Sequence, residues 1–209
     1  VSVSVASVDD PPVLSAPIPD QSIYEDQGNL IINLSEFFSD PDSSANLTFS
    51  ATSSNETLAI PTISGLDLVL SLLSNQFGTS QITIIANSGG QSVSDSFTLE
   101  VQSVNDPPTL SNTPAGGTIS ISESSTYLFD FNATDHEGDS LTFILSGSDS
   151  SFFEVNASSG VIRFKVAPDF ENPLDSDRNN SYELSIVVSD QSSSSQPFSL
   201  LVSIIDLDE

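Results

Sequence analysis

The sequence predicts an all-β protein: two tandem β-sandwiches, each built from seven antiparallel strands in a Greek-key arrangement. Two observations support this prediction. First, β-branched and aromatic residues alternate with Ser and Thr in short runs, which clusters of Gly, Asn and Asp separate. Second, an acidic Pro-Pro motif occurs twice, as Ser7-Val8-Asp9-Asp10-Pro11-Pro12 and as Ser103-Val104-Asn105-Asp106-Pro107-Pro108.

The two Pro-Pro motifs mark the expected domain boundaries. Pro11 and Pro107 are 96 residues apart (107 − 11), a spacing that suits tandem domains rather than a solenoid of ~20–50-residue units. Proline supplies no N–H and fixes φ, so each motif ends one strand and begins a new element. We therefore expect domains at 11–106 and 107–209. Residues 1–10 would then be the tail and linker of a preceding repeat in a longer array.

Each expected domain contains seven strand-like runs. In the first we expect strands near 22–25, 30–34, 46–52, 58–64, 67–73, 80–87 and 93–102. In the second we expect them near 118–122, 127–133, 140–146, 152–155, 160–166, 182–189 and 197–205. A single helical turn is expected at 34–38. The segment 168–180 is longer than its counterpart at 72–78, and it is the main difference between the repeats.

Composition restricts the possible functions. The chain has 29 acidic residues against three basic ones, and its net charge is −26. Nucleic acid is excluded as a partner because nothing could neutralise the phosphates, and an anionic membrane surface is disfavoured for the same reason. There is no Cys, and no apolar run of ~18 residues that would insert into a membrane. Divalent cations would relieve the self-repulsion; solubility in a salty environment is the alternative explanation of the charge.

Short acidic motifs recur at matching places in the two repeats. A Glu follows the first strand, an acid-x-acid step follows the second, and a polar residue ends a late strand; the pairs are Glu25 and Glu123, Asp40-Pro41-Asp42 and Asp135-His136-Glu137, and Asn87 and Asp190. Residues i and i+2 of an extended segment share a face, so both carboxylates of an acid-x-acid step can point the same way. Calcium takes six to eight oxygen ligands, which several such motifs together could supply.

Two further features have weaker signals. Asp175-Ser176-Asp177-Arg178-Asn179 has the 1, 3, 5 spacing of a calcium loop, but Asn180 stands where such a loop has Gly and Ile186 where it has Glu. It is either a local ion site or a surface turn. His136 is the only His and has no nucleophile patterned around it, so we expect no catalytic residues and no enzyme activity.

The second repeat resembles the cadherin family over nearly all of 107–209. The segment 132–137 with Leu141-Thr142-Phe143 resembles the family's Ala-Thr-Asp-x-Asp stretch, and Asp169-Phe170-Glu171 resembles its Asp-Arg-Glu motif. The segment 182–190 is similar to the strand that ends in Ala-x-Asp, and 204–209 to the Asp-x-Asn-Asp linker. The first repeat is more loosely similar to the dystroglycan-type cadherin-like domains of bacterial surface proteins, through 38–42 and 77–80.

The resemblance implies that calcium is bound where consecutive domains meet. For the middle junction it implies Glu25, Asn105, Asp106, Asp135, Glu137 and Asp190 as ligands. For the end of the second repeat it implies Glu123, Asp169, Glu171, Asp206, Asp208 and Glu209, and for the start of the first repeat Asp9, Asp10, Asp40 and Asp42. Ser103 replaces the first Asp of the family's linker, and the first repeat has no Asp-x-Glu motif. The middle junction should therefore bind fewer ions, or bind them more weakly.

These observations together predict a calcium-binding, calcium-rigidified adhesion or extender module of a larger repetitive protein at the cell surface or outside the cell. The expected partners are neighbouring repeats of the same chain, and like domains on another molecule or a polysaccharide. A calcium-dependent carbohydrate-binding module is the alternative, although the chain has no Trp to stack on a sugar ring. A plain spacer whose acids only keep it soluble is the other.

Overall fold

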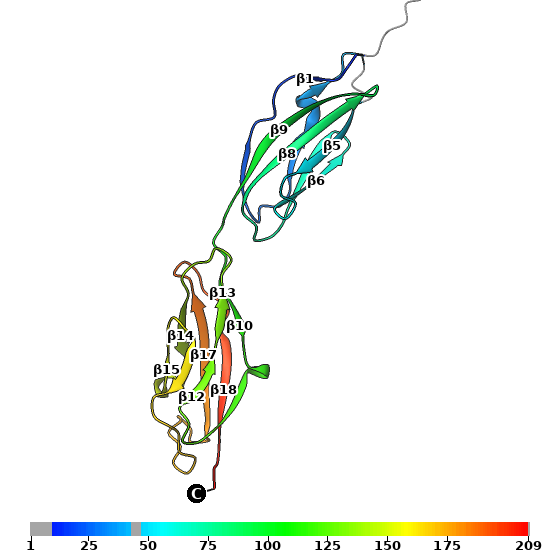
Figure 1. Ribbon diagram of the computed structural model, residues 1–209. Helices are drawn as coiled ribbons and strands as arrows, with labels where there is room; N and C mark the ends of the chain where they lie inside the picture. The colour runs from blue at the N-terminus through cyan, green and yellow to red at the C-terminus, as the bar shows by residue number, and fades with distance from the viewer. Residues whose placement is uncertain (1–9, 43–46, 209) are drawn as a thin grey trace, which may run out of the picture. The chain divides into compact units, whose positions relative to one another are not determined.

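The computed structural model describes residues 10–42 and 47–208. The chain divides into two compact units, Val1–Val104 and Asn105–Glu209 (Figure 1). Each unit has its own hydrophobic core. In the described residues both units consist of strands, turns and short 3-10 segments, without an α-helix. The prediction of tandem all-β sandwiches is confirmed.

The first unit is a sandwich of a four-stranded and a three-stranded sheet. The larger sheet has the order β2 (Gln21–Tyr24), β9 (Gln91–Gln102), β8 (Gly78–Ser88) and β5 (Thr48–Ser53). The smaller has the order β3 (Leu30–Asn33), β7 (Asp67–Leu72) and β6 (Ala59–Ser64). A short pair joins β1 (Val13–Leu14) to β4 (Phe38–Ser39), and the expected helical turn is a 3-10 segment at Leu34–Glu36.

The second unit repeats this architecture. Its larger sheet has the order β11 (Thr118–Ser122), β18 (Phe198–Ile205), β17 (Ser181–Ser189) and β14 (Thr142–Ser146). Its smaller sheet has the order β12 (Tyr127–Asp130), β16 (Val161–Phe164) and β15 (Phe153–Val155). β10 (Thr109–Asn112) pairs with β13 (Asn132–Thr134), and two 3-10 segments lie at Ala115–Gly117 and Ser150–Phe152.

One strand pair in each unit is parallel, not antiparallel. β2 runs parallel to β9, and β11 runs parallel to β18. The cause is a break in the first strand of each unit. In the first unit β1 pairs with β4, and in the second β10 pairs with β13. After the break the chain crosses to the edge of the larger sheet and continues as β2 or β11. Pro17 and Pro19 make the break in the first unit, and Pro114 followed by Gly116 and Gly117 makes it in the second. Proline cannot donate to a ladder, so pairing ends there.

The core of each unit forms from the inward-facing residues of alternating strands. In β17 the alternation is complete, since Tyr182, Leu184, Ile186 and Val188 are all buried. The second core is rich in aromatic rings, with the Phe153 and Phe164 centroids 4.0 Å apart and Tyr182 edge-on to both. Gly160 lies where a Cβ would be 2.2 Å from the carbonyl oxygen of Phe131. This close approach requires Gly.

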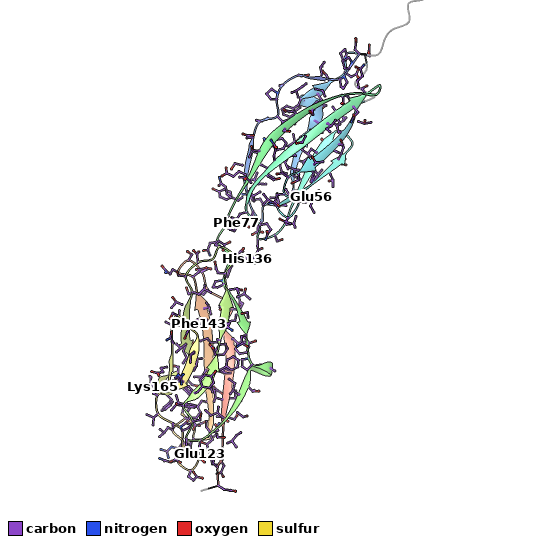
Figure 2. The ribbon with its side chains drawn as sticks, in the orientation of Figure 1. Glu56, Phe77, Glu123, His136, Phe143 and Lys165 are labelled. Atoms are coloured by element: carbon purple, nitrogen blue, oxygen red, sulfur yellow. The ribbon has the colours of Figure 1, made fainter. Side chains whose placement is uncertain are left out.

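The fold places the loops of the second unit at two opposite ends. Figure 2 shows His136 at one end, Glu123 at the other, and Phe143 of the core between them. The linker residues 105–108, the loop after β13 and the loop after β17 belong to the first end, and the segments after β11 and β18 to the second. Among the described residues, no helix has the length and apolar character needed to cross a membrane.

Candidate metal centres

A first group of acidic and amide side chains lies at the linker end of the second unit. We call it the Asp106 cluster; it comprises Asn105, Asp106, Asp135, Glu137 and Asp190. The linker supplies the first two residues, the loop after β13 the next two, and the end of β17 the last. In the loop after β13, His136 is exposed while Asp135 and Glu137 are half-buried. The acid-x-acid step therefore turns both carboxylates to one side, as its spacing predicts.

Hydrogen bonds bring three segments of this cluster together. Nδ2 of Asn105 donates to Oδ2 of Asp190 at 3.0 Å, and the backbone N–H of Asp106 donates to Oε2 of Glu137 at 3.1 Å. The backbone N–H of Asp139 donates to Oδ1 of Asp135 at 3.0 Å. The linker is thereby fixed to both loops within this unit.

Three carboxylate oxygens of the Asp106 cluster are buried without a hydrogen-bond donor: Oδ2 of Asp106, Oδ2 of Asp135 and Oε1 of Glu137. A buried carboxylate oxygen that lacks a partner is unfavourable, and buried charges are ordinarily paired or bound to a metal. In Asp135 and Glu137 the other oxygen already accepts a backbone N–H. The spare oxygens are of the kind that a hard cation such as calcium takes as ligands.

Asp190 differs from the other acids because donors surround it. Oδ1 accepts the backbone N–H groups of Ser192 and Ser193, each at 2.6 Å, and Oδ2 accepts the Ser193 hydroxyl at 2.6 Å. The Ser193 hydroxyl and backbone N–H hold the pKa of Asp190 far below its usual range, since they stabilise the carboxylate. Asp190 is therefore ionised at any physiological pH.

A second group lies at the opposite end of the second unit. We call it the Glu123 cluster; it comprises Glu123, Asp169, Glu171 and Asp206. Within the described residues, Glu123, Asp169 and Glu171 are the one set of three acidic side chains that each offer an oxygen within 4.8 Å of the other two. Glu123 is 3% exposed; its Oε2 accepts the Phe170 backbone N–H at 2.9 Å and its Oε1 that of Leu207 at 2.8 Å.

The pKa values of Glu123 and Glu171 are shifted in opposite directions. The backbone N–H groups of Phe170 and Leu207 lower the pKa of Glu123. For Glu171, its own backbone N–H lowers the pKa, but desolvation and the charges of Glu123, Asp206 and Asp169 outweigh that bond and raise it. Desolvation and nearby negative charge both disfavour the ionised carboxylate, and here they act together on Glu171. A bound cation would reverse the shift.

The first unit presents fewer acids. Glu25 is 1% exposed, and its Oε1 accepts the backbone N–H of Val104 at 2.9 Å, while Oε2 is buried without a donor. In the second unit the equivalent residue, Glu123, has a donor for this oxygen, because its Oε2 accepts the backbone N–H of Phe170 in the Asp-x-Glu motif. The first repeat lacks that motif. At the other end of the unit, the backbone N–H of Asp10 donates to Oδ2 of Asp42 at 2.5 Å, and that of Asp42 to Oδ1 of Asp40 at 2.9 Å.

The structure thus brings together most of the sequence-predicted residues within their own units. Asp208 is exposed and has no polar side-chain contact in the described residues. Asp9 and Glu209 lie outside the described residues. Ser193 was missed by sequence reasoning, although its hydroxyl bonds to Asp190 and accepts from Asn105 at 3.0 Å. It stands in a run of four Ser residues, 192–195, that carries no signal singling it out.

Comparison with known proteins identifies the fold. The chain is similar to the human desmocollin-1 ectodomain (TM-score 0.54, 15% identity) over 95% of its length and 41% of the desmocollin chain. It is similar to mouse cadherin-23 EC22-24 (TM-score 0.54, 19% identity) over 94% of its length and 65% of that chain. A protocadherin gammaB7 EC3-6 cis-dimer structure gives a TM-score of 0.53 at 20% identity, over 95% of this chain and 52% of that one.

These likenesses establish a cadherin-type fold. The chain spans less than two thirds of the length of each of these three structures. No protein-family model matches the sequence, and no curated protein sequence matches it either. The fold and the acidic clusters define a tandem cadherin-like module.

Proposed function

We propose that this chain is a calcium-binding module of an extracellular adhesion or extender protein, and that it is not an enzyme. The observation that carries the proposal is the set of buried, donor-free oxygens on Asp106, Asp135 and Glu137. Such oxygens are costly in a protein with a net charge of −26, unless a cation neutralises them. Calcium suits them because it takes only oxygen ligands and tolerates irregular geometry.

The Glu123 cluster supports the same proposal by independent geometry. Three carboxylates within 4.8 Å of one another are mutually repulsive without a cation, and together with Asp206 they offer several oxygens to one. The residues we assign as calcium ligands are those of the Asp106 and Glu123 clusters, with Glu25, Asp10, Asp40 and Asp42 contributed by the first unit. Asp208 remains an expected ligand from the linker sequence alone.

The proposed role of the ion is mechanical. Calcium held by loops and by the linker would restrict the movement of consecutive repeats and make the tandem a stiffer spacer that presents adhesive domains. The similar desmocollin-1 structure is named as an ectodomain, which accords with a location outside the cell. The proposed partners are neighbouring repeats of the same chain and like domains on another molecule.

Calorimetric titration of the full chain with calcium, in parallel with Asp135→Asn, tests calcium binding. The substitution nearly keeps the shape of the side chain and removes the charge of one donor-free oxygen, so uptake by the wild type and weaker uptake by the variant are expected. No heat from the wild type would contradict the proposal. Small-angle scattering of the same proteins with calcium and with chelator tests stiffening: the wild type should scatter from a narrower distribution of shapes when calcium is present.

A further inference from the structure

The second unit contains an acidic loop that neither proposed cluster uses. Residues 175–180 connect the segment after β16 to β17, and we call them the Asp175 loop. We propose that the Asp175 loop is a separate divalent-cation site that takes calcium through the carboxylates of Asp175 and Asp177. Backbone carbonyls and water would complete the shell.

The loop is held in place by a different acid, Asp149. This residue is 3% exposed, and its Oδ1 accepts both the backbone N–H and the hydroxyl of Ser176, while Oδ2 accepts the Glu183 backbone N–H at 2.8 Å and the Ser148 hydroxyl at 3.3 Å. Both oxygens of Asp149 therefore have donors. Asp149 fixes the loop and has no need of an ion.

Asp175 is buried to the same extent and is only half satisfied. It is 3% exposed, and its Oδ2 accepts the backbone N–H of Asn179 at 2.7 Å, so the carboxylate faces into the loop. Its Oδ1 is buried and has no hydrogen-bond donor. The contrast with Asp149 is informative because the two carboxylates sit in the same part of the unit with equal exposure. Only one of them has an oxygen that lacks a partner.

Asp177 brings a second negative charge into contact with the Asp175 carboxylate. Desolvation, followed by its contact with the Asp175 carboxylate, raises the pKa of Asp177. Arg178 is the only basic residue of the loop, and among the described residues it forms no ion pair. Two carboxylates in contact with no compensating charge are repulsive unless a cation or a proton lies between them.

The backbone of the loop resolves one objection raised by the sequence. Asn180 stands where a calcium loop has Gly, a residue that tolerates φ > 0. In this structure Asn180 itself adopts φ = +62°, and Arg178 adopts φ = +59°. The other departure remains, because Ile186 lies in the core within β17 and cannot close the shell as Glu does. With two carboxylates and no closing Glu, the affinity should be in the weak range of about 10⁻⁴–10⁻³ M.

A calcium titration of the ¹⁵N-labelled full chain, followed amide by amide, tests the proposal. In the wild type the amide signals of Ser176 and Asn179 should shift saturably with calcium. In Asp175→Asn that shift should be lost, while calcium-induced shifts at Asp106 and Ser193 persist. Asp130→Asn is the matched control: it removes an exposed acid of the same unit whose side chain has no polar contact in the described residues, and it should behave as the wild type.

Thermal unfolding gives a second test, because Asp175→Asn should shift the unfolding temperature in opposite directions in chelator and in calcium. In chelator the variant should unfold at a higher temperature than the wild type, since the repulsion with Asp177 is gone. In calcium it should unfold at a lower temperature, since a ligand is gone. If Asp175→Asn does not fold, Asp177→Asn replaces it, because that side chain is exposed.

Three results would overturn the proposal. The loop amides could stay fixed in calcium while those of the Asp106 cluster shift, which would leave the proposed function intact. They could shift equally in the wild type and in Asp175→Asn. They could also respond to pH in chelator but not to calcium, which would show that Asp175 and Asp177 share a proton.

Discussion

Oε1 of Glu25 accepts a 2.9 Å hydrogen bond from the backbone N–H of Val104, which lies 79 residues later in the chain. Glu123 and Leu207 repeat this bond in the second unit at 2.8 Å. In both units a buried Glu next to the first strand of the larger sheet holds the chain where the last strand ends. The difference lies in the other oxygen, which accepts from Phe170 in the second unit and from no donor in the first.

This difference predicts opposite responses to the same substitution. In Glu123→Gln the amide group must face one of two backbone N–H donors, so the unfolding temperature in chelator should fall by several degrees. In Glu25→Gln the amide can replace the donor-free oxygen and remove a buried charge, so the unfolding temperature in chelator should stay the same or rise. Scanning calorimetry of both variants makes the comparison. A fall of similar size in both would contradict it.

Calcium affinity should depend on Glu137. Its Oε2 holds the backbone N–H of Asp106, and its Oε1 is buried without a donor. Glu137→Gln removes one full charge from the Asp106 cluster and should weaken its calcium binding about tenfold, or by about 1.4 kcal/mol. Titration calorimetry against wild type measures this loss, with Asp130→Asn as the control for charge alone. An equal loss in Asp130→Asn would mean that general electrostatics, not ligation, sets the affinity.

The strands were predictable because their periodicity is local. Each predicted strand corresponds to an observed one, although 127–133 is broken at Phe131 into β12 and β13. The two-residue strands β1 and β4 are too short to show a period, and the sequence does not predict β10 either. The parallel pairing of β2 with β9 depends on which sheet edge is free, and a single strand's sequence does not encode that.

The acidic side chains of the candidate sites could be predicted from the sequence, but their hydrogen-bond partners could not. The candidate carboxylates can be recognised in the sequence because short acidic motifs recur at matching places in the two repeats. Hydroxyl and backbone donors do not, because Ser193 and the N–H of Val104 look like their neighbours until the chain is folded. The distinction between a satisfied Asp149 and a half-satisfied Asp175 likewise arises only from tertiary contacts.

Gly160 should be indispensable to the core of the second unit. It has φ = +75°, and an added Cβ would lie 2.2 Å from the Phe131 carbonyl oxygen and 2.9 Å from the Phe143 ring. Gly160→Ala should lower the free energy of unfolding by roughly 2–4 kcal/mol, combining left-handed strain with overpacking. Urea unfolding measures this loss. Gly138→Ala is the control, since it has φ = +77° and open space around it and should lose only the strain component.

Asp149 should contribute to stability in a pH-dependent way. Burial alone would raise its pKa, but the Glu183 N–H and the hydroxyl and N–H of Ser176 outweigh burial and lower it. A depressed folded-state pKa gives stability that is present above the unfolded value of about 3.9 and lost as the pH falls through the folded value. At neutral pH the wild type should exceed Asp149→Asn in free energy of unfolding by roughly 1–3 kcal/mol. Urea unfolding in chelator should show this difference shrinking as the pH falls from 6 to 3. A constant difference across this range would contradict the assignment.

The central claim is that the donor-free and crowded carboxylates of the second unit bind calcium in the folded state. Thermal unfolding of the full chain in millimolar calcium and in chelator tests it most directly, because an ion that binds only the folded state stabilises it by mass action. The stabilisation is about 2.7 kcal/mol at a hundredfold excess over the dissociation constant. We predict a clearly higher unfolding temperature in calcium than in chelator. Coincident unfolding curves would contradict the account.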